Sequence, residues 1–209
     1  MDTILPRSIQ TKCIFSRNHN PNNETATKEY IISTDPTLHS FSAINTAFAQ
    51  EYMYWAKPLS EPVLKEMVDH SLCFGLYKYN IPKPNGIGTT MSPSNFSPNS
   101  SSTPNTNTNT NTTNLTQIGL ARIITDNTTF AYLTDVYILP EHQGAGLGSW
   151  LLQCVTEWVD SRGDSFRRFM LVTVGERAEG YYRRVMGAEV QGRKGEDFVM
   201  AKKGRGGSV

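Results

Sequence analysis

The sequence has 209 residues, of which 38% are hydrophobic, and a formal net charge of +1. This length and composition predict one domain with a sizeable buried core, and the near-neutral charge gives no reason to expect a nucleic acid or a membrane surface as partner. Its three cysteines have no paired spacing, so we expect neither a disulfide framework nor a bound metal. Because no apolar run resembles a signal peptide or a membrane span, we expect a cytoplasmic protein that can also enter the nucleus by diffusion.

The first third of the chain predicts a strand and two helices. Residues 1–28 show no regular hydrophobic period, and we expect an irregular N-terminal segment there. A first strand is predicted at residues 29–34, followed by a helix at about 38–49 with apolar residues spaced three and four apart. A second helix is predicted at about 60–71, where Ser60-Glu61-Pro62 is typical of a helix start.

Composition changes sharply after the second predicted strand, at residues 72–79. Residues 80–116 are mostly Pro, Asn, Ser and Thr, with an Asn-Thr repeat at 105–112. Such a segment cannot bury enough apolar surface to offset its conformational entropy, so we expect a low-complexity, disordered insertion between strands 2 and 3. The Asn-Thr tract also suggests a eukaryotic source, such as a fungus.

The remaining chain alternates strands and helices. The predicted elements are strands at 117–125 and 130–139, a helix at 147–160, a strand at 169–174, a helix at 178–185 and a strand at 198–201. The first two of these strands are expected to pair as an antiparallel hairpin, and the near-continuous apolar run of the third predicts burial on both faces. Residues 202–209 are predicted to be a solvated basic tail.

The most informative stretch joins the strand that ends at Pro140 to the helix that begins near Leu147. Between them lies a short loop with three glycines, Gly144, Gly146 and Gly148. The first amides of a helix have no partner inside the helix and carry the positive end of its dipole, while glycine lets a ligand approach the backbone closely. The stretch therefore predicts a phosphate site, although an ordinary strand–loop–helix connection would use similar residues.

The loop lacks the Gly-Lys-Ser/Thr of a Walker A motif and the spacing of a dinucleotide fingerprint. Its pattern, Gln143-x-x-Gly146-x-Gly148 after Val136-Tyr137-Ile138-Leu139-Pro140, resembles the pyrophosphate loop of the GNAT superfamily of acetyl-CoA-dependent N-acetyltransferases. The resemblance covers about residues 29–201 without the insertion. It implies an α/β (α+β) fold with a central mixed, mostly antiparallel sheet, flanked by helices and splayed between strands 4 and 5.

The same resemblance implies how acetyl-CoA would bind. The backbone of the fourth strand, at Val136, Tyr137 and Ile138, would hold the acetyl-pantetheine arm in the gap between the splayed strands. The pyrophosphate would be bound by the loop and the first helical turn, at Gln143, Gly144, Ala145, Gly146, Leu147, Gly148 and Ser149. Gln143 stands where the family more often has arginine, so this position contributes a hydrogen bond in place of a charge.

A tyrosine is the predicted general acid. The stretch from Ala178 to Gly187 resembles the family segment that carries a tyrosine near the thioester sulfur, and Ala178 aligns Tyr182 with it. One extra residue separates Tyr182 from Gly187, and Ala188 stands where the family has phenylalanine, so Tyr181 remains a second candidate. A tyrosine that only packs is the structural alternative.

Asp135 is the predicted base. It alternates with Val136 and therefore lies, with Tyr137, on the opposite face of the strand. Family members often have an acidic residue near this point, where it could accept the amine proton or pair with a cationic substrate. A structural hydrogen bond to a neighbouring loop is an equal alternative.

Tyr54 and Trp55 are the predicted acceptor-binding residues. They form a Tyr-Trp-Ala element between the first two helices, which resembles that of small bacterial and fungal GNAT proteins. Trp55 could stack on a substrate or contact a cation, or it could be a core aromatic residue.

We therefore expect an enzyme that moves the acetyl group of acetyl-CoA to a primary amine of a small molecule by direct attack, without a metal. Alternatives are a non-catalytic acyl-CoA or nucleotide-binding protein of the same fold, an acetyltransferase for protein or peptide amines, and an interaction protein that works through its insertion. A homodimer is compatible with the family resemblance.

Overall fold

The computed structural model describes residues 10–17, 26–80 and 114–207, with side chains from residue 29 onward within these ranges. The predicted insertion therefore lies almost entirely outside the described residues. Only residue 80 and residues 114–116 of it are described, and the Asn80 amide donates to the Asn114 carbonyl at 2.8 Å. Asn80 and Asn114 thus lie beside each other at the adjoining ends of the neighbouring strands β3 and β4, and the prediction for the residues between them lies outside the described residues.

The described elements follow one another along the chain in this order: β1 (Gln10–Arg17), β2 (Ala26–Ser33), η1 (Pro36–Leu38), α1 (Phe41–Phe48), η2 (Glu51–Met53), α2 (Glu61–Asp69), β3 (Leu72–Tyr79), β4 (Leu115–Thr125), β5 (Phe130–Ile138), η3 (Pro140–His142), α3 (Leu147–Asp160), β6 (Arg168–Val174), α4 (Glu176–Met186), β7 (Glu189–Lys194) and β8 (Asp197–Lys203). Most predicted elements are present within a few residues of their expected ends.

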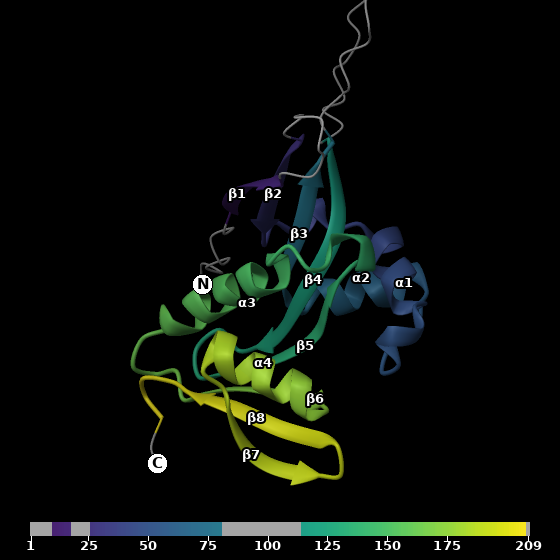
Figure 1. Ribbon diagram of the computed structural model, residues 1–209. Coiled ribbons are helices and arrows are strands. Elements are labelled where there is room, and N and C mark those ends of the chain that lie inside the picture. Colours follow the sequence, from purple (N-terminus) through teal and green to yellow (C-terminus); the bar gives the residue numbers. More distant parts are fainter. Residues whose placement is uncertain (1–9, 18–25, 81–113, 208–209) are drawn as a thin grey trace, which may run out of the picture.

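The strands of the described ranges form one 8-stranded sheet in the order β1-β2-β3-β4-β5-β6-β8-β7 (Figure 1). Every neighbouring pair is antiparallel except β5 and β6, which are parallel. Helices α3 and α4 lie against one face, and α1 and α2 cover part of the other. This arrangement confirms the predicted mixed, mostly antiparallel sheet flanked by helices.

The two faces of the sheet carry separate cores. On the α3 face, Leu151, Val155 and Trp158 pack against apolar side chains of β3, β4 and β5. On the α1 and α2 face, Ile44 and Leu64 are fully buried in a smaller cluster. This cluster also contains side chains of β3, β4 and β5. Because the apolar residues of α3 recur every three or four positions, the sequence alone predicts this buried helical face.

The beginning of α1 differs from its prediction. A short 3-10 helix, η1, occupies Pro36–Leu38, and the α-helix begins only at Phe41. Ser40 caps it, since its Oγ accepts from the Ala43 amide at 3.2 Å. The reason is local. Asp35 caps η1, because its Oδ1 accepts from the Thr37 amide, and this separate short turn ends before α1 starts.

The prediction of an irregular segment up to residue 28 is wrong in part. Gln10–Arg17 forms β1 and pairs along its whole length with β2, which begins at Ala26. The strand is at the edge of the sheet, so its backbone pairs on one side only. Its sequence has three apolar residues in a row between polar ones and so gives no period-2 signal. Backbone pairing with β2 decides its structure.

The predicted basic tail begins too early. Lys202 and Lys203 belong to β8, which pairs with β6. Beyond it, the Gly204 amide donates to the Arg167 carbonyl at 2.9 Å, and the Gly206 amide donates to the Phe166 carbonyl at 3.0 Å. A side chain at Gly206 would collide with the Asp164 backbone, so this closely packed ending needs glycine.

Among the helices of the described residues, none combines the length and the apolar character that a membrane crossing requires.

Candidate active site

The site begins where β5 and β6 separate. Their parallel pairing starts at Phe130 and Arg168 and ends at Leu133 and Leu171. Immediately afterwards β5 has an irregularity, with Asp135 at φ 48 and a register shift against β4. A bulge turns a strand locally, so β5 leaves β6 and a cleft opens between them, as the sequence predicts.

The walls of this cleft include exposed apolar side chains of β6. Val172 is 49% exposed and Val174 is 39% exposed, so the prediction of a strand buried on both faces is wrong. On one face β6 contributes Phe169 and Leu171 to the core. Val172 and Val174 line the open cleft, because β5 pairs with β6 only as far as Leu133 and Leu171.

The glycine-rich loop has a backbone geometry that suits an anion. Gly144 has φ 76 and Gly146 has φ 81, which is left-handed backbone that glycine adopts without strain. Gly146 is the N-cap of α3, so the first amides of a 14-residue helix open onto the loop. Gln143 holds the loop in place, because its Nε2 donates to the Ile138 carbonyl at 2.8 Å and its own amide donates to Pro140.

A groove of about 930 Å³ runs along this loop. The predicted cofactor residues in its lining are Val136, Tyr137, Ile138, Gln143, Gly144, Gly146, Leu147, Gly148 and Ser149. Ala145 instead packs against the core beneath α3. The groove therefore brings together nine of the ten predicted cofactor residues, and Ala145 packs against the neighbouring core.

Two arginines that the sequence analysis did not single out also line the groove. Arg177 and Arg184 come from α4 and are exposed. With Tyr181 between them, their spacing of four and three residues places all three on one helical face. That spacing is the signal that could have predicted them, and two cations beside an amide-rich loop suit a ligand with several phosphate charges.

A second cavity, of about 520 Å³, lies at the other end of the cleft. Tyr54, Trp55, Tyr132 and Thr134 line it, together with residues of β6. It shares a set of wall residues with the groove, namely Val136, Val174, Ala178, Tyr181 and Tyr182. The two spaces therefore meet at the splayed strands and the first two turns of α4.

The two candidate tyrosines stand at this junction in different surroundings. The Tyr181 hydroxyl lies 3.4 Å from Ser149 Oγ, and a β-carbon at Gly148 would come within 3.1 Å of it. Tyr181 is thus tied to the start of α3. Tyr182 lies beside it, with ring centroids 5.7 Å apart, and lines both spaces.

Burial raises the pKa of Tyr182 to about 12, with a smaller contribution from Tyr181. Its phenol therefore keeps its proton at neutral pH. Since a protonated phenol donates a hydrogen bond, Tyr182 can stabilise negative charge that develops at the junction.

Asp135 is buried within a network of side chains from four segments. Its Oδ2 accepts from Arg122 Nε at 2.7 Å, and its Oδ1 accepts from Trp55 Nε1 at 3.2 Å. Arg122 also donates from Nη1 to Ser71 Oγ at 3.1 Å. Of the two alternatives that the sequence leaves open for Asp135, this geometry favours the structural one.

Trp55 and Tyr54 are exposed in the described structure, at 49% and 66%, and their rings meet edge to face with centroids 4.9 Å apart. They lie in the segment after η2 and do not form part of either core cluster. The structure thus favours a ligand-facing position over the core alternative for this pair.

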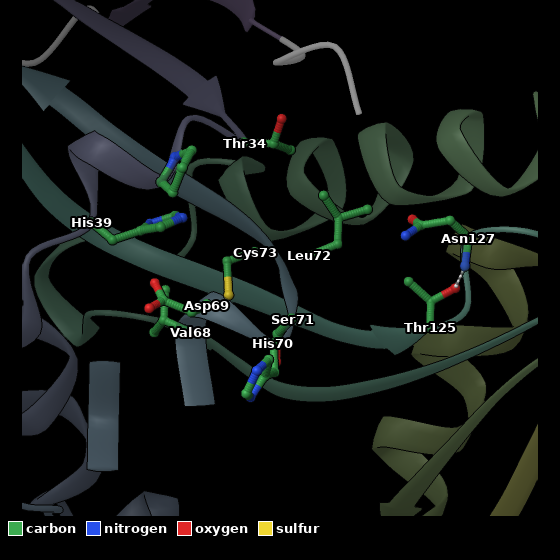
Figure 2. Close-up of a pocket in the computed structure, with 11 residues that line it drawn as sticks. Thr34, His39, Val68, Asp69, His70, Ser71, Leu72, Cys73, Thr125 and Asn127 are labelled. Carbon is green, nitrogen blue, oxygen red and sulfur yellow. Dashed lines mark hydrogen bonds between the residues drawn. The ribbon is translucent and has the colours of Figure 1, made fainter. Parts of the chain in front are cut away.

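A third cavity, of about 550 Å³, lies elsewhere in the fold, where β2 ends and leaves the first residues of β3 without a β2 partner. Figure 2 shows its lining side chains, among them Thr34, His39, Cys73 and Asn127. None of the predicted site residues lines it. Within the described residues, no group of three or more His, Cys, Asp or Glu side chains is placed to hold a metal.

The burial of His39 beside this third cavity leads us to expect that the stability of the protein depends on pH. Burial lowers its pKa to about 4, although Asp35 raises it slightly, and its Nδ1 lies 3.0 Å from the Tyr77 hydroxyl. The unfolded chain binds the proton more readily, so the stability contribution is full above about pH 6.5 and is lost as the pH falls toward about 4. We expect the melting temperature to fall less over this window in His39→Gln than in the parent protein.

The exposed His70 provides the control for that measurement, since it lines the same cavity. His70→Gln is expected to keep the pH dependence of the parent. Equal pH profiles for the parent protein and His39→Gln would contradict the assignment.

The fold and the cleft can be compared with known proteins. The Acetyltransferase (GNAT) family pattern matches residues 110–188. A protein of Gibberella zeae named "putative acetyltransferase" is 39% identical over 145 residues, which are 69% of this chain and 72% of that protein.

Two solved structures are similar to this chain. One, described as a "putative acetyltransferase" of the GNAT family from Xanthomonas campestris, is 29% identical, with coverage of 74% of this chain and 81% of that chain and a TM-score of 0.49. The other, a domain from Methanocaldococcus jannaschii, is 10% identical, with coverage of 93% and 99% and a TM-score of 0.50, and shares the fold. With the Gibberella zeae relative covered over most of its length and the family pattern spanning the glycine-rich loop, the chain belongs to the GNAT family of acetyltransferases.

Proposed function

We propose that the protein transfers the acetyl group of acetyl-CoA to a primary amine of a small molecule. The observation that carries this proposal is the continuity of two spaces of different chemistry. One has an amide-rich loop and two arginines, and the other has aromatic walls. They meet at Val136 and Tyr182, where a thioester and an amine could come together.

The cofactor would lie along the groove with its pyrophosphate at the start of α3. The first amides of α3, after the Gly146 N-cap, have no partner inside the helix, and the helix dipole favours negative charge there. Arg177 and Arg184 would contact the remaining phosphate charge. The pantetheine arm would then run beside Val136 and Ile138, whose strand has no β6 partner after Leu133.

In the transfer step, the neutral amine nitrogen attacks the thioester carbon. A C–N bond forms, the C–S bond breaks, and the amine gives up a proton as the CoA thiolate takes one. Positioning both reactants supplies much of the rate enhancement. Tyr182 would donate a hydrogen bond to the sulfur as its charge develops, since burial keeps the phenol protonated.

Asp135 is assigned a positioning role in this proposal. Both of its oxygens already accept hydrogen bonds, from Arg122 and from Trp55. A base must reach the proton that it removes, and the bonds to Arg122 and Trp55 direct this carboxylate toward its neighbours. The amine proton would therefore leave to water in the open cleft.

Tyr182→Phe tests the role of the phenol. We expect kcat to fall by about 100-fold, because one donor to developing charge is lost, while the KM for acetyl-CoA changes little. Steady-state kinetics with a saturating amine measure both constants.

Tyr181→Phe is the matched variant for that experiment. Because the Tyr181 hydroxyl lies at Ser149, its loss should raise the KM for acetyl-CoA more than it lowers kcat. If Tyr181→Phe lowers kcat and Tyr182→Phe does not, the two roles are reversed.

The proposed function as a whole is tested by calorimetry with acetyl-CoA, followed by mass spectrometry of amines incubated with the protein. Binding and an acetylated amine support it. Binding of acyl-CoA without transfer to any amine would favour a non-catalytic member of the fold.

A further inference from the structure

The end of the cleft beyond the junction is lined mainly by aromatic and aliphatic side chains. Tyr54, Trp55 and Tyr132 contribute rings, and Val172 and Val174 contribute exposed aliphatic surface from β6. A contiguous patch of exposed apolar and aromatic side chains is typical of a ligand-binding groove. The composition of this wall therefore favours a ligand with an apolar body.

Trp55 is also fixed in place although half of its surface is exposed. Its indole nitrogen donates to Asp135 Oδ1 at 3.2 Å, and Arg122 holds the other oxygen of Asp135 at 2.7 Å. Asp135 is 7% exposed, so the polar edge of the indole is anchored toward the interior. The ring is thus a preorganised surface, which lowers the entropy that a stacking ligand must lose.

The charged side chains of the cavity restrict the chemical class of the acceptor further. Among the described residues that line it, Asp135 is the one acidic or basic side chain, and it is paired with Arg122. The two arginines of the site line the cofactor groove instead. A carboxylate or phosphate on the acceptor would have no cation in this lining, and burying an unpaired charge is costly.

We propose that the acceptor is a primary amine on a flat aromatic body that carries no carboxylate or phosphate, with its ring stacked on Trp55 and its nitrogen directed to the junction at Tyr182. This inference rests on the proposed function and adds the substrate class. The chemistry is the transfer described above: the C–N bond forms, the C–S bond breaks, and the amine proton leaves to water.

The test compares three amines at saturating acetyl-CoA. 2-Phenylethylamine has the proposed chemistry, phenylalanine adds a carboxylate, and 2-cyclohexylethylamine replaces the flat ring. We expect kcat/KM for phenylethylamine to exceed that for phenylalanine by about 100-fold, since a buried charge without a partner is rejected. The saturated ring should be about 10-fold poorer, because ring stacking is lost.

Variants at Trp55 show whether the indole sets this preference. Trp55→Leu is expected to raise the KM for phenylethylamine by about 10-fold and to abolish the preference over the saturated ring. Trp55→Phe keeps a ring without the anchoring N–H, so it should retain the preference at reduced kcat/KM. Neither variant should change acetyl-CoA binding, because Trp55 does not line the groove.

Equal or faster turnover of phenylalanine would overturn the inference, as would a Trp55→Leu protein that keeps the aromatic preference. Transfer to a polyamine or a lysine peptide but not to phenylethylamine would also overturn it, with the proposed acetyltransferase function intact. Absence of acetyl-CoA binding would overturn the proposed function itself.

Discussion

Replacing Gly146 by glutamate is expected to weaken acetyl-CoA binding by at least about 100-fold, because the change acts twice on the anion site. Gly146 has φ 81, a backbone conformation that residues other than glycine rarely adopt. The new carboxylate would also lie at the N-terminus of α3, where it would repel the negatively charged ligand that we propose for this site. Titration calorimetry of the parent protein and Gly146→Glu measures the difference.

Gly195→Glu is the matched control for backbone strain. Gly195 has φ 60, and an added β-carbon there would meet no atom within 4 Å, as at Gly146. It lies in the turn between β7 and β8 and does not line the groove. This variant should therefore lose similar stability and keep its affinity for acetyl-CoA. Equal loss of affinity in both variants would assign the effect to folding and contradict the loop assignment.

Arg122→Met is expected to lower the free energy of unfolding by about 3–5 kcal/mol, since breaking a buried ion pair leaves one charge without its partner. The side chains of Arg122 and Asp135 are 13% and 8% exposed. Removal of the guanidinium also leaves Ser71 Oγ without that donor. Denaturant unfolding of the parent protein and the variant gives the difference.

The double variant Arg122→Met/Asp135→Asn separates the ion pair from simple packing loss. Asparagine tolerates the φ of 48 at this position and carries no charge, so the double variant should be more stable than Arg122→Met alone. Lys65→Met breaks the exposed Lys65–Asp69 pair and is expected to change stability by less than about 1 kcal/mol. If the effects of Arg122→Met and Asp135→Asn on the free energy of unfolding, each measured alone, add up to that of the double variant, the two side chains are not coupled.

The groove of the candidate site could be predicted from the sequence because most of its lining residues are neighbours in the chain. Val136 to Ser149 form a strand end, a loop and a helix start within fourteen residues. Local rules act at that range: Pro140 begins a 3-10 turn after the strand, glycine permits positive φ, and spacing of three and four residues marks the buried face of α3.

Two of the predictions that were wrong, those for β1 and β6, concern long-range context. Gln10–Arg17 forms a strand only because β2 pairs with it. The apolar run of β6 predicts burial on both faces, but β5 diverges after Leu133 and exposes Val172. In each case the residue's own neighbours in sequence carry no information about which strand lies beside it.

What the sequence by itself determined is the family resemblance, the order of the strands and helices around the loop, and the residues of the loop and helix start that line the groove. Only the tertiary structure decided the role favoured for Asp135, because its partners Arg122 and Trp55 lie 13 and 80 residues away along the chain. Only the tertiary structure also placed Arg177 in the groove and Trp55 on the cavity wall. The physical reason is that backbone conformation and helix periodicity are encoded locally, whereas the pairing of side chains depends on how distant segments pack.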